Sequence, residues 1–74
     1  MPKADKRDEA AFYEIRVQGV LDEGWSAWLG GLEVTPLERG ETLLAGLVRD
    51  QAALHGLLNK IRDLGLPLLG LEKK

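Results

Sequence analysis

The sequence contains no cysteine, one histidine and one serine, so several common reactive groups are scarce. Without cysteine there can be no disulfides and no thiolate ligands for a metal. The single histidine, His55, cannot form a zinc site unless several carboxylates converge on it. No nucleophile stands beside a recognisable base, because Ser26 is the only serine and no thiol is present. We therefore predict no catalytic site, no metal site and no cofactor.

Long apolar runs are also absent, and none approaches the roughly 18 residues that a membrane span needs. Residues 1–11 are charged where a signal peptide would need an apolar core. The formal net charge of −2 gives no general attraction to nucleic acid or to anionic lipid. These features predict a cytoplasmic protein that binds neither membranes nor nucleic acid.

The chain is short, with 74 residues, of which 45% are hydrophobic and 30% charged, a composition typical of globular proteins. A chain of this size buries only about 60% of the surface that its unfolded form exposes. Small proteins compensate with disulfides, metals or oligomerisation, and the first two are excluded above. We therefore expect the chain to associate with copies of itself, as a homodimer or a larger ring.

A single α+β domain is predicted for residues 12–72, after a disordered charged tail in residues 1–11. Order begins with the stretch 13–18, which alternates apolar and polar residues with period two. That period is typical of a strand with one buried face. The inward side chains are Tyr13, Ile15 and Val17, and the outward ones are Glu14, Arg16 and Gln18.

A short helix is predicted next, because Asp22 occupies an N-cap position and Gly30-Gly31 supplies a C-terminal stop. Trp25, Trp28 and Leu29 follow the i, i+3, i+4 spacing that places side chains on one helix face. Core packing is the favoured interpretation of the two tryptophans. An oligomer interface and an aromatic wall for a ligand are the alternatives.

Two more strands are predicted at 32–35 and 42–48, joined by a turn at 38–41. Pro36 lacks an N–H group, which favours a sheet edge for the first of these strands. The second is apolar on both faces, which indicates a central strand. Its outward residues are expected to be aliphatic or Thr42, without the aromatic platform that an RNA-binding sheet uses.

The second helix is predicted over residues 51–64, with Asp50 as its N-cap and Gly65 as its end. Its apolar arc contains Ala53, Leu54, Leu57, Leu58, Ile61 and Leu64. The opposite side contains the candidate interaction surface, made of Gln51, His55, Asn59 and Arg62. A merely solvated helix surface is the simpler alternative for these residues. A last strand is expected around Leu68, Leu69 and Leu71.

The predicted order βαββαβ is most economically a ferredoxin-like fold, with a four-stranded antiparallel sheet and two helices on one face. Strands one and three are central in that arrangement. The first helix is short for it, which leaves a less regular α+β variant open. The sheet face turned away from the helices is expected to be partly apolar, as interfaces between copies usually are.

Two segments carry a resemblance to a known family. The opening YEIRV-x-G-x-L-D-E-x-W corresponds to residues 13–25, and DQAALHGLL-x-x-IRDLGLPLL corresponds to residues 50–69. On these segments the chain resembles a family of short uncharacterised bacterial proteins. The resemblance spans most of the predicted domain and implies no particular activity.

Two functions remain open. The favoured one is a non-enzymatic, homo-oligomeric interaction or scaffold module whose partners are its own copies and a second protein. The alternative is a regulatory domain that senses a small molecule held at the subunit interface. A ligand wall formed by Trp25 or Trp28 would favour the sensor.

Overall fold

A computed structural model describes residues 10–74 of the chain. It contains four strands, one α-helix and two short 3₁₀ turns. Their bounds are β1 Ala11–Gln18, η2 Glu23–Trp25, β2 Glu33–Pro36, η3 Glu38–Gly40, β3 Glu41–Val48, α1 Gln51–Asp63 and β4 Leu68–Lys73. The chain is therefore an α+β protein with a four-stranded sheet.

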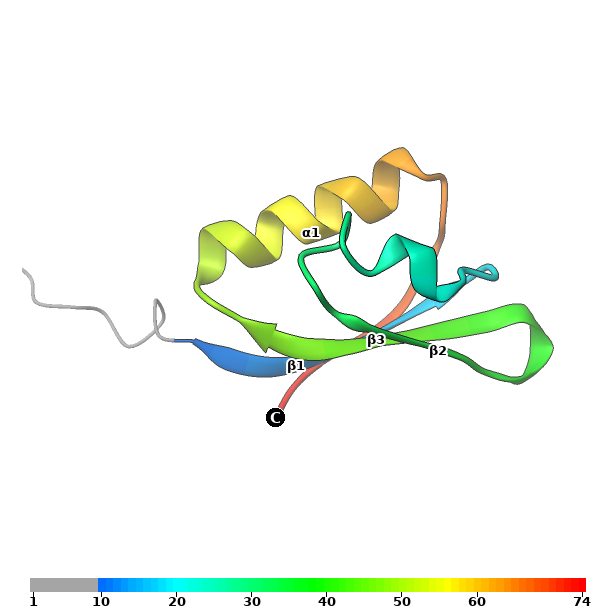
Figure 1. The fold of residues 1–74 in the computed structure, drawn as a ribbon, viewed down its shortest axis with the longest axis horizontal. Coiled ribbons are helices and arrows are strands. Elements are labelled where there is room, and N and C mark those ends of the chain that lie inside the picture. The colour runs from blue at the N-terminus through cyan, green and yellow to red at the C-terminus, as the bar shows by residue number, and fades with distance from the viewer. Residues whose placement is uncertain (1–9) are drawn as a thin grey trace, which may run out of the picture.

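All neighbouring strands of the sheet are antiparallel, in the order β2-β3-β1-β4. The predicted central positions of the first and third strands are confirmed. Helix α1 and the segment that contains η2 lie on the same side of the sheet (Figure 1). No segment among residues 10–74 covers the other side, which we call the open face (Figure 1).

The core lies between the sheet and α1, as the alternating pattern of β1 predicts. Ile15 pairs with Leu44 across the two central strands, and both are fully buried. From the helix, Leu54, Leu57 and Ile61 pack on them. The predicted apolar arc of the second helix is confirmed, because its remaining members are half-buried against the same core.

Helix α1 begins and ends where its capping residues predict. The Asp50 carboxylate accepts a hydrogen bond from the Ala53 N–H at 2.8 Å, which satisfies one of the free donors of the first turn. At the other end, Gly65 has φ +77° and its N–H donates to the Arg62 carbonyl. A positive φ is easily reached only by glycine, so Gly65 stops the helix.

The connection between β2 and β3 is a four-residue turn, residues 37–40, that contains η3. Its residues Arg39 and Gly40 both have positive φ, 65° and 73°. The Gln18 side-chain amide donates to the carbonyl oxygens of both residues, at 3.0 and 3.3 Å. This contact ties the turn to the end of β1.

The prediction of a helix between Asp22 and Gly31 is wrong. The segment after Asp22 forms only the 3₁₀ turn η2 and further turns, so the two-helix ferredoxin-like arrangement is not found. The Ser26 hydroxyl donates to the Leu32 carbonyl at 2.6 Å, and the Gly31 N–H donates to the Ser26 carbonyl at 2.7 Å. These bonds close the chain back on itself, and so short a segment cannot offset the cost of nucleating an α-helix.

The expected outward position of Thr42 is also wrong. Thr42 is fully buried on the helix side, paired with Val17. Its hydroxyl donates to the Gly19 carbonyl at 2.6 Å and accepts from the Leu21 N–H at 3.2 Å. A polar side chain is tolerated there because both of its hydrogen-bonding capacities are used.

The predicted charged tail falls outside the described residues, apart from Ala10 and Ala11, and Ala11 belongs to β1. Among residues 10–74, no helix has the length and apolarity required to cross a membrane.

Candidate functional site

The predicted interaction surface lies on the outer side of α1. The helix turns its apolar arc toward the sheet, which leaves His55, Asn59 and Arg62 exposed. Gln51 differs, because it is half-buried and its side-chain nitrogen lies 3.4 Å from the Tyr13 hydroxyl. The structure therefore brings three of the four predicted residues together on a solvated surface.

The three exposed side chains of that surface carry an imidazole, an amide and a guanidinium group. The His55 side chain makes no hydrogen bond to another residue of the range 10–74, and His55 lines none of the clefts identified on this part of the chain. Nor do His, Asp and Glu side chains of the same range form a group of three or more that could hold a metal. A general base needs a partner within hydrogen-bond reach, and residues 10–74 supply none to the His55 side chain.

The two tryptophans contact each other: Trp25 is the last residue of η2, and Trp28 lies in the turns that follow. Their rings meet edge to face, with centroids 5.7 Å apart and planes at 75°. Trp25 is half-buried against the core, whereas Trp28 is 42% exposed. Lys60 of α1 donates to the Trp28 carbonyl at 2.9 Å, and its ammonium lies 5.3 Å from the Trp28 ring centroid. The contacts between Lys60 and Trp28 thus hold the turn segment against the helix.

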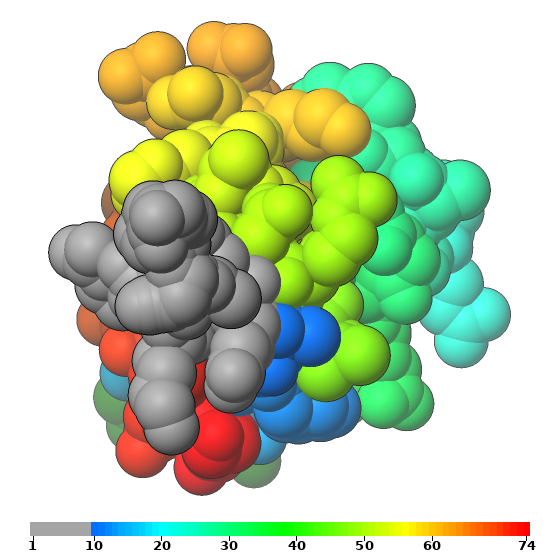
Figure 2. Space-filling model, turned by 90° about the vertical axis from the view of Figure 1, so that its left-hand side faces the viewer, coloured from blue at the N-terminus to red at the C-terminus, as the bar shows by residue number. Residues whose placement is uncertain are grey.

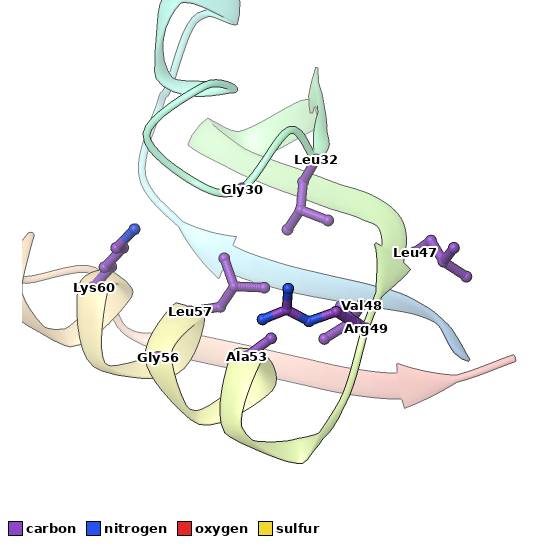
Figure 3. Close-up of a pocket in the computed structure, with 9 residues that line it drawn as sticks. All are labelled: Gly30, Leu32, Leu47, Val48, Arg49, Ala53, Gly56, Leu57 and Lys60. Carbon is purple, nitrogen blue, oxygen red and sulfur yellow. The ribbon is translucent and has the colours of Figure 1, made fainter. Parts of the chain in front are cut away.

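A cleft of about 420 Å³ lies between α1, the end of β3 and the turn at Gly30 (Figure 3). Figure 2 shows α1 and this turn above the same side of the sheet. Leu32, Val48, Ala53 and Leu57 form apolar walls. Neither tryptophan lines the cleft.

Two cations border this cleft, and sequence analysis did not select either of them. Arg49 extends from the end of β3 toward Ala53 and Leu57, and Lys60 enters from α1 (Figure 3). The Arg49 Nε lies 3.5 Å from the Asp50 carboxylate, and its side chain remains 85% exposed. Gly56, in the middle of α1, also lines the cleft. A glycine inside an otherwise strong helix pattern was the one signal in the sequence that pointed here.

The open face carries a strip of apolar side chains along the two central strands. Phe12 pairs with Leu47 across β1 and β3, and these residues are 43% and 66% exposed. Leu43 and Ala45 continue the strip along β3, and both are half-buried. We call these four residues the apolar strip.

Charged residues on the same face pair with one another. Arg16 lies 3.4 Å from Glu41, and the Lys74 ammonium lies 3.5 Å from Glu14 and 3.4 Å from Glu72. The hydrogen bond to Glu72 and the nearby charge of Glu14 raise the pKa of Lys74 above its ordinary value of 10.5. These pairs neutralise charges beside the apolar strip.

A further cleft, of about 450 Å³, runs below the end of α1 beside β4. Leu58, Leu66 and Leu68 line it, together with Arg62. Strand β4 is an edge strand whose Leu68, Leu69 and Leu71 are exposed. Exposed apolar residues therefore gather on the open face and at the β4 edge, while Val20, Trp28 and Leu37 are exposed singly elsewhere.

Comparison with known proteins gives a family and no activity. No curated protein matches the chain, and no solved structure does. The profile of the family described as "Domain of unknown function (DUF8691)" matches residues 12–72. The match covers most of the chain, from within β1 to within β4, in agreement with the resemblance to an uncharacterised family. The chain belongs to this domain family of unknown function.

Proposed function

We propose that this chain is a non-enzymatic interaction module that assembles with copies of itself through the open face of its sheet. The observation that carries the proposal is the apolar strip of Phe12, Leu43, Ala45 and Leu47 on a face that residues 10–74 leave uncovered. Contiguous exposed apolar surface of this kind usually marks an interface.

A twofold dimer is the arrangement that suits the strip best. Two sheets packed face to face lie about 10 Å apart and interdigitate their facing side chains. In a twofold interface the same surface serves on both copies, so Leu47 of one copy would cover the strip of the other. Apolar contact there would remove Phe12 and Leu47 from water, which is the main favourable term in association.

The charges on the open face support the same arrangement. Burying an unpaired charge is strongly unfavourable, and such charges normally prevent a face from being covered. Here Arg16 is already paired with Glu41, and Lys74 with Glu14 and Glu72. These pairs lower the cost of covering that part of the face. Glu33, which lies opposite Ala45, has no ion-pair partner among residues 10–74 and would have to stay at the rim of the interface.

The surroundings of Ser26 and His55 favour a binding role over catalysis. The Ser26 hydroxyl is engaged with the Leu32 carbonyl at 2.6 Å, which removes it as a free nucleophile. His55 is exposed on the outer side of α1. That side stays free in a face-to-face dimer, so His55, Asn59 and Arg62 form the surface that we propose for a second protein.

The test is the native mass of the protein by light scattering across a dilution series, for the natural sequence and three lysine variants. Leu47→Lys places a charge in the apolar strip and is expected to shift the protein toward monomer. Val20→Lys is the matched control, because Val20 is 74% exposed in the loop after β1, outside the sheet. Leu71→Lys places the same charge on the β4 edge. Circular dichroism establishes that each variant is folded.

The outcomes separate the possible interfaces. A dimer that Leu47→Lys dissociates, and that Val20→Lys and Leu71→Lys leave intact, supports assembly through the open face. Dissociation by Leu71→Lys alone would overturn that interface in favour of edge pairing. A natural chain that is monomeric at micromolar concentration would overturn self-assembly altogether.

A further inference from the structure

We propose that the cleft between α1, the end of β3 and the turn at Gly30 binds a small amphipathic carboxylate. The ligand class is a singly charged acid with a short aliphatic tail. The assignment rests on the shape of the cleft, the placement of Arg49 and Lys60, and the glycine at position 56. This site uses a different face of the molecule from the self-assembly proposed above, although Leu47 of the apolar strip also lines one end of this cleft.

The walls of the cleft suit an aliphatic tail. Leu32, Val48, Ala53 and Leu57 come from three separate segments and face a common space of about 420 Å³. Pockets for small molecules typically measure about 300–1,000 Å³ and are mostly apolar, with a few polar groups. Each methylene of a tail placed there is expected to raise the affinity roughly fourfold.

The charges at the cleft suit an anionic headgroup. Among residues 10–74, Arg49 and Lys60 are the charged residues that line it, although the whole chain has a formal net charge of −2. An arginine side chain can hold a carboxylate with two parallel hydrogen bonds. Lys60 donates one of its hydrogens to the Trp28 carbonyl, which leaves two for a ligand.

Asp50 competes with a ligand carboxylate for Arg49, and changing Asp50 therefore tests the role of Arg49. One of its carboxylate oxygens caps α1 through the Ala53 N–H, and the other lies 3.5 Å from Arg49. Asparagine caps a helix about as well as aspartate does. Asp50→Asn should therefore keep the helix while releasing Arg49 for the ligand.

The packing of the described residues does not require a glycine at position 56 of α1. Glycine is among the least favourable residues inside a helix. A Cβ atom at this position would meet nothing within 4 Å, so no close approach within the described chain calls for glycine. Because Gly56 lines the cleft, its missing side chain enlarges the space for a ligand. Gly56→Ala should make the protein more stable and its ligand affinity lower.

The experiment titrates the purified protein with octanoate, followed by amide NMR shifts at Gly30 and Gly56 and by calorimetry. Octan-1-ol is the uncharged comparison, and hexanoate shortens the tail by two methylenes. We expect octanoate to bind at millimolar concentration or below, and octan-1-ol to bind at least tenfold more weakly. Hexanoate should bind roughly sixteenfold more weakly than octanoate, from the loss of two buried methylenes.

Four variants then locate the site. Arg49→Gln should weaken octanoate binding about tenfold, the factor expected for one charged hydrogen-bonding partner at the low end of its range. Asp50→Asn should strengthen it severalfold, and Gly56→Ala should weaken it while raising the unfolding midpoint. Arg39→Gln is the matched control, since Arg39 is an exposed arginine in the turn between β2 and β3, outside this cleft, and it should leave the affinity unchanged.

Several results would overturn the proposal. Equal binding of octanol and octanoate would show that the cations select nothing. Equal losses in Arg49→Gln and Arg39→Gln would show a general charge effect without a site. Absence of NMR shifts at millimolar octanoate, with the protein folded, would show that the cleft takes no such ligand.

Discussion

Leu32 packs on the backbone of Gly46, so closely that a Cβ atom at position 46 would lie 2.8 Å from the Leu32 Cδ2 atom. Leu32 comes from the turn segment and is almost fully buried, whereas Gly46 lies within the central strand β3. Glycine normally weakens a strand, and here it admits the side chain that fills the space beside α1.

Gly46→Ala is therefore expected to destabilise the protein by about 1–3 kcal/mol, the usual effect of overpacking. The free energy of unfolding in urea measures it. Gly70→Ala is the control, because a Cβ atom at position 70 would meet nothing within 4 Å. That change should leave stability unchanged or raise it by up to about 1 kcal/mol. Equal destabilisation by both changes would contradict the packing described.

Thr42→Val is expected to lower stability by about 1–3 kcal/mol although the two side chains have the same shape. The change leaves the buried Leu21 N–H and the Gly19 carbonyl without their partner. Thr35→Val provides the comparison, because Thr35 is exposed on β2, and its effect should stay within about 0.5 kcal/mol. A neutral result for Thr42→Val would mean that these hydrogen bonds are replaced by water.

Asp50→Ala is expected to destabilise the fold by about 1 kcal/mol, through loss of the cap at the Ala53 N–H. Asp63 lies at the other end of α1, where a negative charge opposes the helix dipole. Asp63→Ala should therefore have no effect or a slightly stabilising one. Thermal unfolding followed by circular dichroism compares the two, and equal losses would exclude a specific capping role.

Lys74 should titrate above its ordinary pKa of 10.5, because it hydrogen-bonds to Glu72 and is attracted by Glu14. A raised pKa in the folded state means that the charged Lys74 stabilises the fold, and that this stabilisation is complete at a pH below the unfolded pKa. It is then lost as the pH rises through the folded pKa. An NMR titration of the Lys74 side chain measures the pKa directly. Glu72→Gln should lower it more than Glu14→Gln does, and an unchanged pKa in both variants would contradict the pairing.

Much of the sheet and the whole of α1 could be predicted because their signals are local. The alternation from Tyr13 to Val17 reflects one buried face, and Asp50 and Gly65 mark the ends of α1 by their own chemistry. The spacing of Trp25, Trp28 and Leu29 was misleading, since a series of tight turns brings the same residues together. Local patterns cannot distinguish the two when the segment is so short.

The candidate cleft could not be predicted because its parts meet only in the folded chain. Arg49 and Lys60 belong to different elements, and Leu32 joins them from a third. No spacing in the sequence relates these residues. The inward position of Thr42 was missed for a similar reason, because its hydrogen-bond partners, Gly19 and Leu21, lie about twenty residues earlier in the chain.

The place of β1 between β3 and β4 determines how quickly the molecule can fold. Strands β2 and β3 are joined by the short η3 turn and can pair early, and α1 needs only local contacts. Strand β1, by contrast, meets β3 only after the whole segment between Gln18 and Glu41 has closed into a loop. Closing such a loop costs entropy before the non-local pairing can offset it. Docking of β1 is therefore expected to limit the folding rate, and changes in β1 should slow refolding more than changes in α1.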